Sequence, residues 1–157
     1  MNTDDYVSYP IALALKKAGF DEPCHYGYSV KMRLEPELSF GEPKMVHSKT
    51  PKNYNDNRKG IAKGLEFCSA VPLWQAQKWL REKKGYDVAL CPEGEFLKTE
   101  RTYRHTGWNY SIIRISKIGI MTPGPIGNVL MSKYEQALSE GIKSALELIN
   151  TEDHNHE

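Results

Sequence analysis

Residues 132–149 carry the pattern that most restricts the fold of this chain. Ser132 and Glu135 have the spacing of a capping box, in which the serine oxygen and the glutamate carboxylate each bind a backbone amide at the start of a helix. Apolar side chains then recur at helical spacing in one broad stripe, namely Tyr134, Ala137, Leu138, Ile142, Ala145, Leu146 and Ile149. We therefore expect a helix that covers most of one face of a sheet. Gly141 lies within the stripe at a cost of about 1 kcal/mol relative to alanine, which predicts the close approach of another backbone.

Three segments have the alternation that is typical of strands, and they are residues 24–32, residues 86–91 up to Pro92, and residues 108–118. In the last segment Trp108 and Ile112 alternate with Ile113 and Ile115. Apolar residues on both sides predict a central strand that is covered, at least in part, on both faces. Weaker patterns predict short strands at 38–40 and 96–103, and a loop at 119–130.

Two further helices are predicted by their start and stop signals. The first spans residues 8–18, with Ser8 as its N-cap and with Gly19 in place for a left-handed C-cap, after which Phe20 folds back onto Leu15. The second begins at Pro72 and ends before Gly85. In this second helix, one face carries Leu73, Ala76 and Leu80, and a different face carries Trp74, Lys78 and Arg81.

These elements together predict an α+β fold, with a small, mainly antiparallel sheet of three to five strands and about three helices packed on one face. We expect residues 1–150 to form a single domain that carries a long polar and basic insert at about 34–68. The polar residues 151–157 are expected to form a disordered tail.

Charge and composition exclude several classes of protein. The 157 residues include 21 Lys plus Arg and 20 Asp plus Glu, so the net charge of +1 creates no overall attraction to nucleic acid or to an anionic membrane. No apolar run approaches the roughly 18 residues of a membrane span, and the acidic N-terminus is not a signal peptide. Three cysteines fit a reducing cytoplasm better than a disulfide scaffold. We therefore expect a cytoplasmic protein.

Three segments resemble an uncharacterised group of small proteins encoded in Bacteroidetes genomes and their phages or prophages. They are Ala14-Leu15-Lys16-Lys17-Ala18-Gly19-Phe20-Asp21-Glu22-Pro23-Cys24, the central Gln75-Ala76-Gln77-Lys78-Trp79-Leu80-Arg81-Glu82-Lys83, and Tyr134-Glu135-Gln136-Ala137-Leu138-Ser139-Glu140-Gly141-Ile142. The match covers under half of the chain, and 34–67 and 92–131 depart from the pattern. The group has no assigned activity, so the resemblance implies only a cytoplasmic, mobile-element context.

Segregated charge is the strongest functional signal. Residues 44–63 contain six basic residues and one acidic residue, with Tyr54 interleaved, and the second predicted helix adds further cations beside Trp74. Such a segment can follow phosphates while an exposed aromatic ring stacks on a base. The residues predicted to contact nucleic acid or an acidic protein are Lys49, Lys52, Tyr54, Arg58, Lys59, Lys63, Trp74, Lys78 and Arg81. The alternative interpretation is a merely solvated basic loop, with Trp74 packed beneath it.

Motifs for catalysis and for metal binding are missing from the sequence. It contains no Cys-x-x-Cys or His-Glu-x-x-His pattern and no phosphate-binding glycine loop, so no metal and no cofactor is predicted. Cys24 and His25 are adjacent, and adjacent strand residues point to opposite faces. The leading hypothesis is therefore a non-enzymatic binding or accessory protein. The rival hypotheses are a small hydrolase that uses Glu95, His105 or Cys91, and a structural homodimer that pairs through an exposed strand edge.

Overall fold

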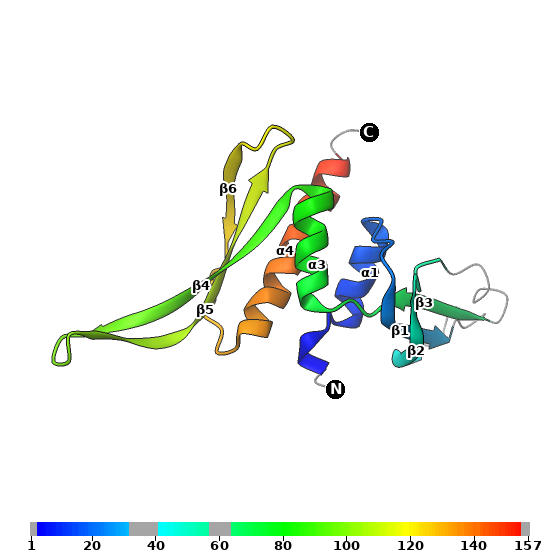
Figure 1. The fold of residues 1–157 in the computed structure, drawn as a ribbon, viewed down its shortest axis with the longest axis horizontal. Helices are drawn as coiled ribbons and strands as arrows, with labels where there is room; N and C mark the ends of the chain where they lie inside the picture. The colour runs from blue at the N-terminus through cyan, green and yellow to red at the C-terminus, as the bar shows by residue number, and fades with distance from the viewer. Residues whose placement is uncertain (1–2, 32–40, 57–63, 155–157) are drawn as a thin grey trace. The chain divides into compact units, whose positions relative to one another are not determined.

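A computed structural model describes residues 3–31, 41–56 and 64–154 (Figure 1). The chain folds into two compact units. The N-terminal unit is Tyr6–Pro72, and the C-terminal unit joins Met1–Asp5 to Leu73–Glu157. The described residues form two antiparallel three-stranded sheets and three α-helices. The predicted α+β class is confirmed, with the strands divided between two sheets.

The sheet of the N-terminal unit has the order β2-β1-β3 and is accompanied by helix α1. Its elements are α1 (Tyr9–Lys17), β1 (Cys24–Lys31), β2 (Lys44–Lys52) and β3 (Leu65–Ser69). Helix α1 ends as predicted, because Gly19 adopts a φ of +88° and the Phe20 amide donates a hydrogen bond of 2.9 Å to the Leu15 carbonyl. Ser8 occupies the N-cap position, but its side chain makes no capping hydrogen bond.

Two strands lie within the segment that was predicted to be a polar insert. Strand β2 forms one edge of the sheet, and β3 pairs with the other side of β1. Edge strands commonly carry lysine and proline, as β2 does at Lys49 and Pro51, and these residues hide the pattern of a strand. The predicted strand at 38–40 lies outside the described residues.

The C-terminal unit packs helices on one sheet of order β4-β5-β6. Its elements are η1 (Thr3–Asp5), α3 (Leu73–Trp79), the π-helical turn η2 (Leu80–Lys84), β4 (Tyr86–Leu97), β5 (Thr102–Ile115), β6 (Met121–Ile126) and α4 (Tyr134–His154). The second predicted helix is confirmed, and Gly85 ends it with a φ of +74°.

The hairpin of β4 and β5 is longer than predicted. Pro92 lies inside β4 rather than ending it, and the predicted strand at 96–103 is instead the turn end of the hairpin. Strand β6 occupies part of the predicted loop at 119–130, where Pro123 and Pro125 are tolerated because β6 is an edge strand.

Helix α4 lies against β4 and β5 (Figure 1). Tyr110 Oη and Ser144 Oγ form a hydrogen bond of 2.7 Å between β5 and the helix. The close approach predicted at Gly141 is present, but the nearest atoms belong to the side chains of Val88 and Tyr110 rather than to a backbone. The helix begins at Tyr134, and the Lys133 carbonyl accepts the Ala137 amide.

Two predictions need correction, one about where helix α4 ends and one about which faces of strand β5 are covered. Helix α4 runs to His154, so it continues into the segment expected to be a disordered tail. Strand β5 is central, as predicted, but only one of its faces is covered. Ile112 is 1% exposed beneath α4, whereas Ile113 and Ile115 on the other side are half-buried.

Candidate functional site

Strand β2 carries three cations on the N-terminal unit. Lys44, Lys49 and Lys52 are all exposed on this edge strand. Among the described residues, none of the three forms an ion pair with a carboxylate. Exposed lysines without acidic partners keep their charge available for an anionic ligand. The predicted contacts Arg58, Lys59 and Lys63 lie outside the described residues.

Tyr54 has a different position from the one predicted. Its side chain is 5% exposed, and its ring covers Gly27 so closely that a Cβ there would lie 2.5 Å from the ring atoms. Its hydroxyl donates a hydrogen bond of 3.2 Å to the His25 carbonyl. The Lys52 Nζ lies 4.7 Å from the centre of this ring. Tyr54 therefore does not offer a stacking surface, and instead holds Lys52 in place.

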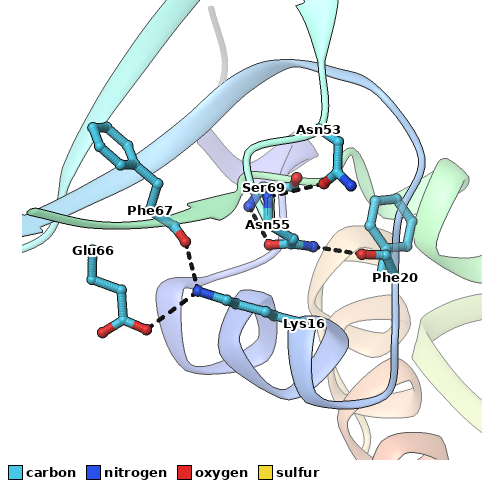
Figure 2. A network of polar contacts seen from close by, with 7 residues as sticks. All are labelled: Lys16, Phe20, Asn53, Asn55, Glu66, Phe67 and Ser69. Atoms are coloured by element: carbon cyan, nitrogen blue, oxygen red, sulfur yellow. Dashed lines mark hydrogen bonds and ion pairs between the residues drawn. The ribbon is translucent and has the colours of Figure 1, made fainter. Parts of the chain in front are cut away.

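The turn that follows β2 is fixed by a polar network (Figure 2). Asn55 donates to the Phe20 carbonyl at 2.7 Å and accepts the Ser69 amide at 3.0 Å. The Asn53 side chain accepts the Asn55 amide at 2.9 Å, which is an Asx turn. These bonds join three separate parts of the N-terminal unit. The sequence alone predicts a loop here, because Phe20 and Ser69, the hydrogen-bond partners of Asn55, lie far away along the chain.

Helix α3 and turn η2 present the second cationic surface, on the C-terminal unit. The two predicted faces are confirmed, since Leu73, Ala76 and Leu80 are buried. Trp74 is 63% exposed, and Lys78 and Arg81 are exposed one and two turns further along. The exposed indole of Trp74 is accessible to a ligand on this face of the helix.

The cations of this surface differ in whether they have an acidic partner. The Arg81 Nη1 atom lies 3.3 Å from the Asp87 carboxylate, with both side chains partly exposed. This ion pair orients the guanidinium and leaves Lys78 as the unpaired cation beside Trp74 among the described residues. Lys84 lies over the ring of buried Trp79 at 5.4 Å. Residues 73–84 contain four basic residues and one acidic residue, so the surface is positive.

The residues proposed for a hydrolase are not brought together. Glu95 forms an ion pair of 2.7 Å with Arg104, its partner across the hairpin. His105 follows Arg104 and points to the other face of the sheet. There the centre of its ring lies 5.1 Å from the centre of the Trp108 ring. Cys91 pairs with Asn109, on the face opposite Trp108. These three side chains therefore do not form a catalytic group.

The two buried cysteines are held as thiols. Burial raises the pKa of Cys24 to about 11 and the pKa of Cys68 to about 12. At neutral pH neither side chain is a thiolate, which is the nucleophilic form of cysteine. Both therefore act as small apolar core residues.

Two further kinds of feature are absent from the described residues. The described residues contain no group of three His, Cys, Asp or Glu side chains placed to hold a metal ion. Within the same ranges, no helix has the length and apolar character needed to cross a membrane.

Comparisons of the chain with protein families, with curated proteins and with solved structures give no significant match. No residue role is therefore carried over from another protein, and the function is argued from geometry and charge.

Proposed function

We propose that this protein is a non-enzymatic accessory protein that binds single-stranded nucleic acid. The observation that carries the proposal is the Trp74 ring, which is 63% exposed on the same helical face as Lys78, with Arg81 exposed in the turn that follows. A base stacks on the indole, and the neighbouring cations meet the phosphates on either side of it. Stacking of one base on an aromatic side chain contributes about 1–3 kcal/mol.

The geometry of the helix suits this division of roles. Trp74 and Lys78 are four positions apart in α3 and share one face, and the α-helical rise of about 1.5 Å per residue places Lys78 about 6 Å along the axis from Trp74. Arg81 follows in the π-helical turn η2, where it is exposed. Long flexible side chains at these positions reach phosphates that flank a stacked base. Arg81 already has a carboxylate neighbour in Asp87, so we assign the larger share of phosphate contact to Lys78.

The lysines of β2 support the same function as further phosphate contacts. Lys49 and Lys52 are exposed, and the aromatic contact of Lys52 with Tyr54 restricts its position. Each phosphate neutralised on a single strand adds about −0.7 to the slope of log affinity against log salt concentration. Removal of both lysines should therefore reduce the slope by about 1.4.

The test uses the full chain and a fluorescently labelled oligothymidylate, with binding followed by anisotropy. We expect Trp74→Ala to weaken binding by about 1–3 kcal/mol, or roughly 5-fold to 150-fold. Lys117→Ala is the matched control, because it removes an exposed cation that belongs to neither surface. Binding that is independent of salt, or equal in Trp74→Ala and Lys117→Ala, contradicts the proposal.

An acidic protein is the competing partner, and the same assay separates the two. Polyglutamate should compete with an acidic protein ligand for the surface. Its own binding should be unchanged in Trp74→Ala. If polyglutamate competes with the oligothymidylate and Trp74→Ala has no effect, the surface binds acidic protein rather than nucleic acid.

The mobile-element setting and the cytoplasmic location are part of the proposal. They are supported by the resemblance of the three segments described above and by the three free cysteines. Flanking genes for phage replication or packaging would support this setting, and a neighbourhood of housekeeping genes alone would count against it.

A further inference from the structure

One side of the C-terminal sheet is largely apolar, and none of the described helices of its own unit packs on it. Helix α4 lies on the side of Ile112, so Ile113 and Ile115 point to the opposite side. Cross-strand partners share a face, and the partners of Ile115 and Ile113 on β6 are Met121 and Pro123. We call this surface the open face, and it comprises Asp87, Ala89, Cys91, Asn109, Ser111, Ile113, Ile115, Met121, Pro123 and Ile126. Its charged member, Asp87, is paired with Arg81 of the same chain at 3.3 Å.

Several apolar side chains of the open face are highly exposed. Met121 is 68% exposed and Ile126 is 66% exposed. The turn that joins β5 to β6 adds Ile118 and Ile120, which are also exposed. Residues 118–126 contain no charged side chain. Contiguous exposed apolar surface of this kind marks an interaction site.

The strand edge beside this face is unsuited to pairing with another strand. Strand β6 contains Pro123 and Pro125, which have no backbone N–H to donate to a further strand. The homodimer that was predicted to pair through a strand edge is therefore disfavoured at β6. A partner has to meet the sheet through side chains.

We propose that the open face binds a second copy of this chain, sheet against sheet. Charge decides between the occupants, because nucleic acid and acidic proteins require cations, and the open face has none among its members. A lipid surface is favoured by a rim of basic and aromatic residues, whereas the β5–β6 turn offers only Lys117. The carboxylate of Asp87 is paired with Arg81 within the chain, so the rest of the face is apolar and can meet a second copy of itself, which is the requirement of a two-fold interface.

The size of the open face sets the strength of the dimer. Three strands about 4.8 Å apart and about six residues of 3.3 Å rise give roughly 300 Å² in projection. Standard interfaces bury about 800 Å² on each partner. We therefore expect a weak, reversible dimer. The open face excludes Trp74 and Lys78, and it borders the proposed nucleic-acid surface where Asp87 pairs with Arg81, so dimerisation and nucleic-acid binding are measured separately.

Sedimentation equilibrium of the full chain tests the proposal. The weight-average mass should rise from 17.9 kDa toward twice that value as the protein concentration is raised. Met121→Lys should remain monomeric throughout, with its thermal unfolding unchanged because the side chain is exposed on an edge strand. Val129→Lys is the matched control, since Val129 is 64% exposed but lies outside the open face, and it should dimerise like the parent.

Cys91 provides an independent measure of which surface is buried. It is the exposed cysteine of the three, and it lies on the open face. A short bismaleimide should therefore cross-link the parent chain into a dimer, and should not do so in Met121→Lys or Cys91→Ser. A parent chain that is monomeric at every concentration overturns the proposal, as does a dimer that Met121→Lys leaves intact. Monomers that bind phosphatidylglycerol vesicles through Met121 overturn it in favour of a lipid surface.

Discussion

Replacement of Gly141 by alanine tests the packing of α4 on its sheet, because two known effects oppose each other at this site. Alanine favours a helix over glycine by about 1 kcal/mol. The added methyl group would, however, overlap Val88 Cγ1 and lie 3.2 Å from Tyr110 Cγ. The result therefore shows whether helix propensity or packing dominates.

The structure indicates that packing dominates. Val88 is fully buried in β4, and valine is restricted at χ1, so its methyl group cannot move aside. The nearest atoms of Tyr110 are Cβ and Cγ at the base of the side chain, which are held by the strand. Overpacking of a core costs about 1–3 kcal/mol. After the gain of about 1 kcal/mol in propensity, we expect Gly141→Ala to destabilise the protein by up to about 2 kcal/mol.

The assay is urea unfolding followed by tryptophan fluorescence. All three tryptophans lie in the C-terminal unit, so the signal reports the sheet on which α4 packs. Asn150→Ala is the control for propensity alone, because Asn150 is exposed on the same helix and should gain about 0.5 kcal/mol. A double-mutant cycle then isolates the contact.

In the Val88→Ala background the steric overlap is removed, and Gly141→Ala should become neutral or stabilising. The expected coupling between the two positions is at least about 1 kcal/mol. If Gly141→Ala stabilises the parent protein as Asn150→Ala does, α4 does not contact Val88 and the packing argument is wrong.

Four further predictions concern the N-terminal unit and the thiols. Gly27→Ala places a methyl group 2.5 Å from the ring that covers it, and should cost about 1–3 kcal/mol in urea unfolding; an unchanged midpoint would contradict that contact. Asn55→Ala removes two hydrogen bonds and should cost about 1–3 kcal/mol, with Asn55→Asp losing less because it keeps the acceptor. A thiol reagent should modify only Cys91 in the native chain and three cysteines after unfolding. Because burial raises the pKa of Cys24 to about 11 and of Cys68 to about 12, the stability they contribute is present below pH 9.0 and is lost as pH rises through these values.

Sequence rules located the helices because the signals are local. Gly19 and Gly85 end their helices in the left-handed conformation, which side chains disfavour, so the stop is encoded at one position. The start of α4 was less exact, because Lys133 takes the N-cap position in place of Ser132. Neighbouring residues compete for a cap, and the choice depends on the path of the preceding loop.

Edge strands were the elements that sequence rules missed. Strand β6 contains Pro123 and Gly124, and β2 contains Pro51 with exposed lysines. An edge strand receives its hydrogen bonds on one side only, from a partner elsewhere in the chain, so its own residues need little strand preference. Asn55 was likewise predicted to lie in a loop, because the partners that make it a link among three segments are distant in the sequence.

The sequence by itself determined which residues share a face, as on α3, where Trp74 is separated from Leu73 and Ala76. Only the tertiary structure decided which faces are covered: it buried Tyr54 over Gly27, and it left one side of β5 exposed while α4 covered the other. Periodicity is a property of neighbouring residues and assigns each side chain to a side. Burial depends on which distant segment packs against that side, and no local pattern contains this information.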